Sequence, residues 1–100
     1  MDNLKVKKMM PLQTGVSERG EWKSREVVLE EIDERIQYPN QYVVRFSGDR
    51  VNQLDSIKEG DTVTCHWSSR VREFHTRDGR EVAVQENNGW GVRKIEGLKD

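Results

Sequence analysis

Apolar residues recur at every second position in several short runs of this chain, a spacing typical of β-strands with one buried face. Two runs show it most clearly, at residues 41–47 and 62–67. The residues that this alternation places toward a core are Tyr42, Val44, Phe46, Val63, Cys65 and Trp67. With 100 residues, 33% of them hydrophobic and 35% charged, the chain has material for one thin core. We therefore expect a single all-β domain over residues 1–100.

The first third of the chain is predicted to form two strands. Residues 4–16 alternate weakly and are interrupted at Pro11, which belongs at a strand edge or a bulge because it has no backbone N–H. Residues 22–31 alternate with Val27 and Leu29 on one side. A competing helix would align Val28, Leu29, Ile32 and Ile36 on one face. We favour the strand.

The rest of the chain adds one short helix and two strands. Asp49 is a plausible N-cap for a helix through Ile57, in which apolar residues recur every three positions. The Asp78–Gly79 pair predicts a hairpin turn after the strand that begins at residue 62, because glycine supplies the positive φ that tight turns need. The final strand starts at Glu81, breaks at Asn87-Asn88-Gly89 and resumes with Trp90, Val92 and Ile95, and we expect Trp90 in the core.

This order of elements, with one short helix between the third and fourth strands, is that of the OB-fold, a five-stranded and partly open Greek-key barrel. Three stretches resemble bacterial single-stranded DNA-binding proteins: an aromatic strand at residues 42–46, a segment at residues 58–63, and a long strand ending at residues 69–74 before a Gly-tipped hairpin. The whole chain also resembles a family of small bacterial OB proteins of unassigned function. The features that carry this second resemblance are Trp22-Lys23, Tyr38-Pro39, Gly60-Asp61 followed by Val63, the Arg-containing hairpin and the late Trp90.

Binding of single strands requires cations for phosphates and flat side chains for bases. Residues 66–80 contain four arginines, two histidines, Trp67 and Phe74 against two acids. The resemblance implies that Phe74 and Trp22 stack bases, whereas Arg45 stands where the family has a core residue, so that Phe46 points inside. We expect nucleic-acid contacts from Trp22, Lys23, Arg70, Arg72, Phe74, His75, Arg77 and Arg80. The alternative is that Phe74 and Trp67 plug the barrel ends and the arginines form a solvated face.

Several other kinds of site are not indicated. The two histidines are nine positions apart without zinc-ligand spacing, and Gly89-Trp90-Gly91 lacks the remainder of a phosphate-binding loop. We expect no metal, no cofactor and no enzymatic activity. The single cysteine, Cys65, the absence of an apolar run long enough for a membrane span, and an N-terminal stretch without signal-peptide features predict a cytoplasmic protein with a buried structural thiol.

These observations predict an OB-fold protein that binds single-stranded DNA or RNA. The net charge of −1 argues against an indiscriminate binder of polyanions. DNA is the favoured ligand, in replication, repair or recombination, with proteins of those processes as further partners. The alternative is an OB module for protein–protein interaction or dimerisation that binds no nucleic acid. We also expect a homodimer or higher oligomer, because a single small barrel leaves sheet edges to cover.

Overall fold

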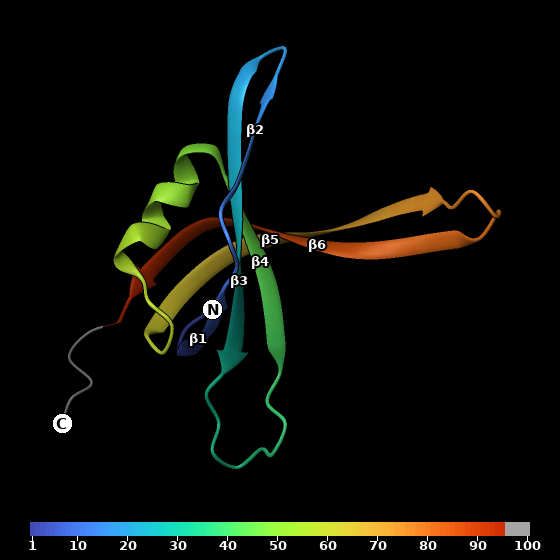
Figure 1. The fold of residues 1–100 in the computed structure, drawn as a ribbon. Helices are drawn as coiled ribbons and strands as arrows, with labels where there is room; N and C mark the ends of the chain where they lie inside the picture. Colours follow the sequence, from blue (N-terminus) through green and yellow to red (C-terminus); the bar gives the residue numbers. More distant parts are fainter. Residues whose placement is uncertain (96–100) are drawn as a thin grey trace.

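The protein is described by a computed structural model of residues 1–95, which is all-β apart from one 3₁₀ helix (Figure 1). The elements are β1 (Leu4–Met9), β2 (Gln13–Ser17), β3 (Gly20–Glu31), β4 (Gln41–Ser47), η1 (Gly48–Ser56), β5 (Thr62–His75) and β6 (Glu81–Lys94). No helix in this part of the chain is long and apolar enough to cross a membrane.

The number of strands differs from the expected five, because residues 4–16 form two strands. Pro11 lies between β1 and β2, and a proline cannot donate a backbone hydrogen bond to a neighbouring strand. Both strands pair antiparallel with β3: β1 pairs with its second half and β2 with its first half. The break at Pro11 thus divides one long, bent edge into two segments on the same partner.

The strands close on themselves into a ring of hydrogen bonds. The sheet order is β1-β5-β6-β4-β3-β2, and β1 pairs with β3 as well as with β5. A short parallel pairing, Arg45 with Asn88, joins β4 to β6. The ring therefore runs β1-β5-β6-β4-β3 and back to β1, with β2 attached outside it to β3.

The core fills this ring, and the alternation in the sequence placed it correctly. Phe46, Val44, Val63 and Cys65 are fully buried, and the expected strand at residues 22–31 is confirmed with Val27 and Leu29 buried on its inner side. Other partly buried side chains cover the core, among them Tyr42 and Trp67, whose ring centroids lie 5.3 Å apart.

The helix is η1, a 3₁₀ helix, and it covers the core with Val51 and Leu54. Three residues per turn suit the three-residue spacing of the apolar positions in this segment. The expected N-cap is wrong: Ser47 caps the helix, without a side-chain hydrogen bond, and Asp49 lies in the first turn.

Two expectations for β6 are also wrong. The strand does not break at residues 87–89 but continues through them with a β-bulge. His66 pairs with Gly91 and Trp67 with Gly89, so Trp90 is the extra residue. An extra residue shifts the alternation of its strand by one position, and Trp90 is 51% exposed instead of buried.

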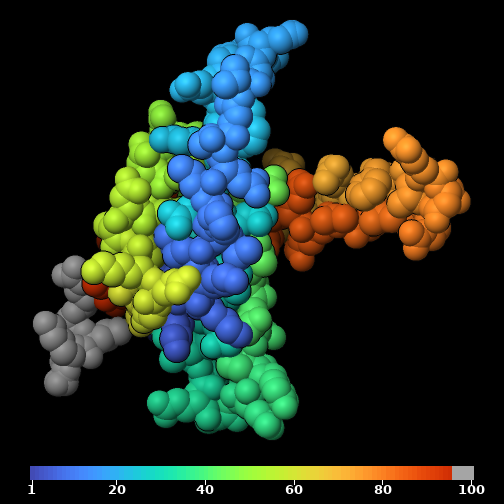
Figure 2. Space-filling view, viewed as in Figure 1, coloured from blue at the N-terminus to red at the C-terminus, as the bar shows by residue number. Residues whose placement is uncertain are grey.

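Two hairpins extend beyond the ring (Figures 1 and 2). The β2–β3 hairpin and the distal half of β5–β6 project in different directions, and we call them the first arm and the second arm. The second arm comprises residues 68–88, and its turn contains Gly79 at φ +87°, as the Asp-Gly pair predicted. Phe74 lies on this arm and is 39% exposed, so the alternative in which it plugs the barrel is wrong.

The buried thiol of Cys65 gives a direct test of the core. Burial raises the pKa of this thiol to about 11, and only the thiolate reacts with disulfide reagents. At pH 8 we expect Cys65 to react with Ellman's reagent at least about tenfold more slowly in the folded protein than in denaturant. Rapid and stoichiometric labelling of the folded protein would contradict the burial of this side chain.

Candidate nucleic-acid interface

Four neighbouring strands, β3, β4, β6 and β5, share one surface that points away from the core, and we call it the outer face. Residues that pair directly across neighbouring strands point to the same side of a sheet. Glu26 pairs with Arg45, Arg45 with Asn88, and Asn88 with Ser68. This row of four residues crosses all four strands and fixes the outer face at the foot of the second arm.

The outer face continues along β5 at alternate positions. From Ser68 it passes through Arg70 and Arg72 to Phe74, as the sequence predicted for these three residues. The guanidinium carbon of Arg72 lies 5.2 Å from the centre of the Phe74 ring, within the range of a cation–π contact. Two arginines and an aromatic ring thus lie in line on one side of the strand.

The two sides of the second arm differ in charge, although the arm as a whole is neutral. It holds four arginines and four acids, because β6 adds Glu81 and Glu86 to the acids already present in β5 and the turn. On the outer face Arg70 and Arg72 stand against Glu86 alone. The opposite side carries Glu73 and Glu81. The outer face is therefore the side that favours an anionic ligand.

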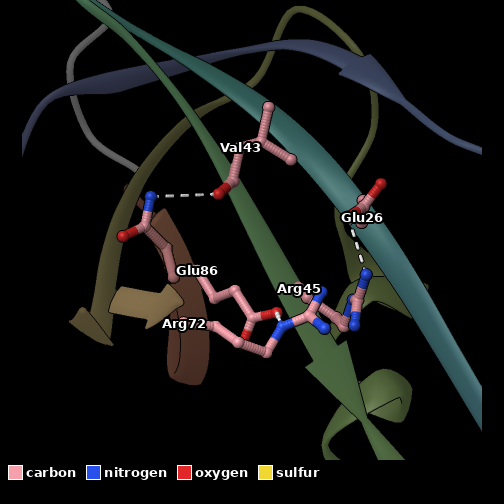
Figure 3. A network of polar contacts seen from close by, with 6 residues as sticks. Glu26, Val43, Arg45, Arg72 and Glu86 are labelled. Carbon is pink, nitrogen blue, oxygen red and sulfur yellow. Dashed lines mark hydrogen bonds and ion pairs between the residues drawn. The ribbon is translucent and has the colours of Figure 1, made fainter. Parts of the chain in front are cut away.

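A polar network lies where the second arm leaves the ring (Figure 3). Arg45 pairs with Glu26 at 3.3 Å, and Arg72 pairs with Glu86 at 3.0 Å. A cleft of about 180 Å³ lies between these residues and Val43. Exposed ion pairs of this kind stabilise a protein by about 0–1 kcal/mol, so a phosphate group can replace either carboxylate as the partner of its arginine.

The remaining predicted residues lie elsewhere. Trp22 is on the first arm, where its half-exposed ring covers Gly15 of the neighbouring strand; a Cβ atom on Gly15 would lie 2.4 Å from that ring. Because Trp22, Ser24 and Glu26 alternate along β3, Trp22 continues the outer face onto the first arm. Trp22 and Phe74 therefore lie on different arms, which project in different directions (Figure 1).

Lys23, His75, Arg77 and Arg80 are not brought together with Arg70, Arg72 and Phe74. Lys23 alternates to the other side of β3 and donates a hydrogen bond to Asn52 Oδ1 at 3.0 Å. His75 lies on the acidic side of the second arm, 3.5 Å from Glu81. Arg77 and Arg80 are in the turn, where Arg80 pairs with Asp78.

Sequence reasoning missed an aromatic pair on the outer face. Trp90 stacks on His66, with ring centroids 4.9 Å apart and planes at 19°. His66 precedes Ser68 by two positions and so lies on the same side of β5 as Arg70. A bulge has no reliable signature in a single sequence, and without it Trp90 falls on the buried side. Among residues 1–95, no group of three or more His, Cys, Asp or Glu side chains is arranged to hold a metal ion.

These features define an all-β protein in which a closed ring of strands supports two exposed hairpin arms and an outer face bearing aromatic and arginine side chains. The chain belongs to a family described as a domain of unknown function (DUF3127), whose pattern matches residues 3–93. The expected membership of a small family of unassigned function agrees with this match. A comparison with curated proteins found no match.

Proposed function

We propose that the ring is an OB barrel and that its outer face binds single-stranded nucleic acid, with DNA in replication, repair or recombination as the favoured setting. If β1 and β2 count as one strand broken at Pro11, the ring has the five strands and the helix position of an OB-fold. OB-folds bind oligonucleotides on the face of strands 2 and 3 and on the loops that follow strands 1 and 4. Here these parts are the outer face of β3 and β4 and the tips of the two arms.

The observation that carries this proposal is the alignment of Arg70, Arg72 and Phe74 on the less acidic side of the second arm. A stacked base contributes about 1–3 kcal/mol whatever its identity, and cations nearby bind the phosphates. Arg45 lies at the foot of the same surface and adds a third cation. Such an arrangement suits a flexible single strand, whose bases are free to stack.

The charged part of this interface can be tested separately from the aromatic part. Wild type and the Arg70→Ala/Arg72→Ala double variant are titrated with a twelve-residue oligothymidylate at several salt concentrations, with tryptophan fluorescence as readout. Each phosphate contact contributes about 0.7 to the slope of log K against log salt for single strands. We expect the double variant to show a slope shallower by about 1.4.

The matched control is Lys5→Ala/Lys8→Ala, which removes the same charge from β1, a strand that contributes nothing to the outer face. For this variant the slope of log K against log salt should equal that of wild type to within half of the contribution of one phosphate contact. An equal reduction of this slope in both double variants would show that binding depends on net charge alone and not on the position of the arginines. Wild-type binding no tighter than millimolar at low salt would refute the proposed function.

A second candidate function is protein–protein interaction through the second arm. The arm is neutral overall, it exposes Val71 and Val84, and beyond Ser69 its two strands have no further neighbours among the described residues. Exposed strand edges and apolar side chains favour pairing with another chain, including a second copy. Binding of this kind would hardly respond to salt, which distinguishes it from nucleic-acid binding.

A further inference from the structure

The exposed pair of Trp90 and His66 is the one aromatic cluster of the outer face that the preceding proposal does not use. Trp90 is a large apolar side chain, and the bulge in β6 holds it outside the core with half its surface exposed. Its ring lies nearly parallel to that of His66 on β5. The two stacked rings together form an exposed aromatic surface at the foot of the second arm.

The backbone around Trp90 is held in place by the helix. Gln53 of η1 accepts a hydrogen bond from the Val92 N–H at 2.9 Å and donates one to the Trp90 carbonyl at 3.4 Å. These two bonds tie the bulged residue and the residue two positions after it to one side chain. The backbone at Trp90 is therefore fixed before any ligand binds, which reduces the loss of conformational freedom when a ligand stacks on the Trp90 ring.

The surroundings of the pair suit a nucleotide. A hollow of about 350 Å³ adjoins His66 and is lined also by Gln53, Thr64 and Arg93. Arg93 pairs with Thr64 across the strands, so it lies level with the residue two positions before His66 in β5, on the side of His66 away from Phe74. An aromatic surface and a cation thus occur together here, as they do at Phe74 and Arg72, and a hollow lies beside them.

We propose that Trp90, supported by His66, is a second base-stacking site, and that a single strand runs along the outer face of β5 from Phe74 to Trp90. This inference rests on the proposed function and adds the path of the bound strand and the number of nucleotides that the surface holds. His66 and Phe74 are eight positions apart on one strand, a distance of about 26 Å at about 3.3 Å per residue, which accommodates about four extended nucleotides. Arg70 and Arg72 lie between the two aromatic sites.

The titration that tests this inference uses the wild-type sequence, and variants serve only to assign signals. The protein is labelled with 5-fluorotryptophan, and the three tryptophan signals are assigned by ¹⁹F NMR through single Trp→Phe variants. On addition of a twelve-residue oligothymidylate we expect the Trp90 signal to shift in proportion to binding, while the signal of the half-buried Trp67 stays unchanged. A Trp90 signal that does not move while the oligonucleotide binds would overturn the inference.

Affinity provides the second measurement. We expect Trp90→Ala to weaken binding by about 5- to 150-fold, the range for loss of one stacked base, and Trp90→Phe to retain most of it. Tyr38→Ala is the matched control, because Tyr38 is a more exposed aromatic residue, at 81%, in the loop between β3 and β4. Wild-type affinity in Trp90→Ala, alongside weakened binding in Phe74→Ala, would refute the second site and leave the proposed function standing. Absence of binding by wild type would refute both.

Discussion

Phe74→Ala is expected to weaken binding to oligothymidylate by about 5- to 150-fold at every salt concentration, because stacking of a base on this ring contributes about 1–3 kcal/mol. Stacking involves no release of counterions, so the slope of log K against log salt should stay close to that of wild type. This behaviour is the reverse of that expected for the double arginine variant. The measurement is the same fluorescence titration, preceded by circular dichroism to verify folding.

Val71→Ala is the matched control for this prediction. Val71 lies on the same strand, is 63% exposed, and points to the opposite side of the second arm from Phe74. Its removal should leave affinity within about twofold of wild type, because it lies away from the proposed path. Equal losses in Phe74→Ala and Val71→Ala would mean that the arm as a whole, and not its outer face, determines binding.

Gly89→Ala is expected to destabilise the protein by about 1–3 kcal/mol, the usual effect of overpacking a core. Gly89 is buried opposite Trp67 in the bulge of β6. A Cβ atom there would lie 2.5, 2.6 and 2.8 Å from three atoms of the Phe46 ring. The Phe46 ring is fully buried and has little room to move, so backbone or ring must shift. Urea unfolding gives the change in the free energy of unfolding.

Gly91→Ala serves as the control, two positions along the same strand. A Cβ atom there would be 3.8 Å from His66, an ordinary van der Waals contact, and we expect a change within about 0.5 kcal/mol. The double variant Gly89→Ala/Phe46→Leu should be less unstable than the sum of the two single changes, because a smaller side chain at position 46 relieves the overlap. Strict additivity would show that Phe46 is not the residue that the new methyl group meets.

Local patterns in the sequence determine much of this fold, and they were sufficient where each element depends on its own residues. Alternation identified the buried side of β4 and the base of β5, and a three-residue apolar spacing identified the helix. The Asp78–Gly79 turn followed from the conformational freedom of glycine at a position with φ +87°. The same alternation placed Arg70, Arg72 and Phe74 on one side of a strand.

The features that could not be predicted depend on contacts between distant parts of the chain. The bulge at Trp90 directly follows Gly89, against which the Phe46 ring packs, and Phe46 is more than forty positions away in the sequence. Similarly, the difference in charge between the two sides of the second arm became visible only when β6 was paired with β5, which placed Glu86 beside Arg70 and Glu81 on the opposite side. Sequence windows restricted to one strand contain neither fact.

The closure of the ring determines how this chain must fold. Leu4 pairs with Val63, about sixty residues later, and Arg45 pairs with Asn88, about forty residues later, and each such closure requires a large loss of chain entropy before its contacts form. The hairpins that become the two arms are local and form in microseconds, whereas topologies dominated by distant pairings fold in milliseconds to seconds. We therefore expect ring closure by β1 to be the slow step of folding, and until it occurs the edges of β3 and β5 that β1 covers would remain open to pairing with other chains.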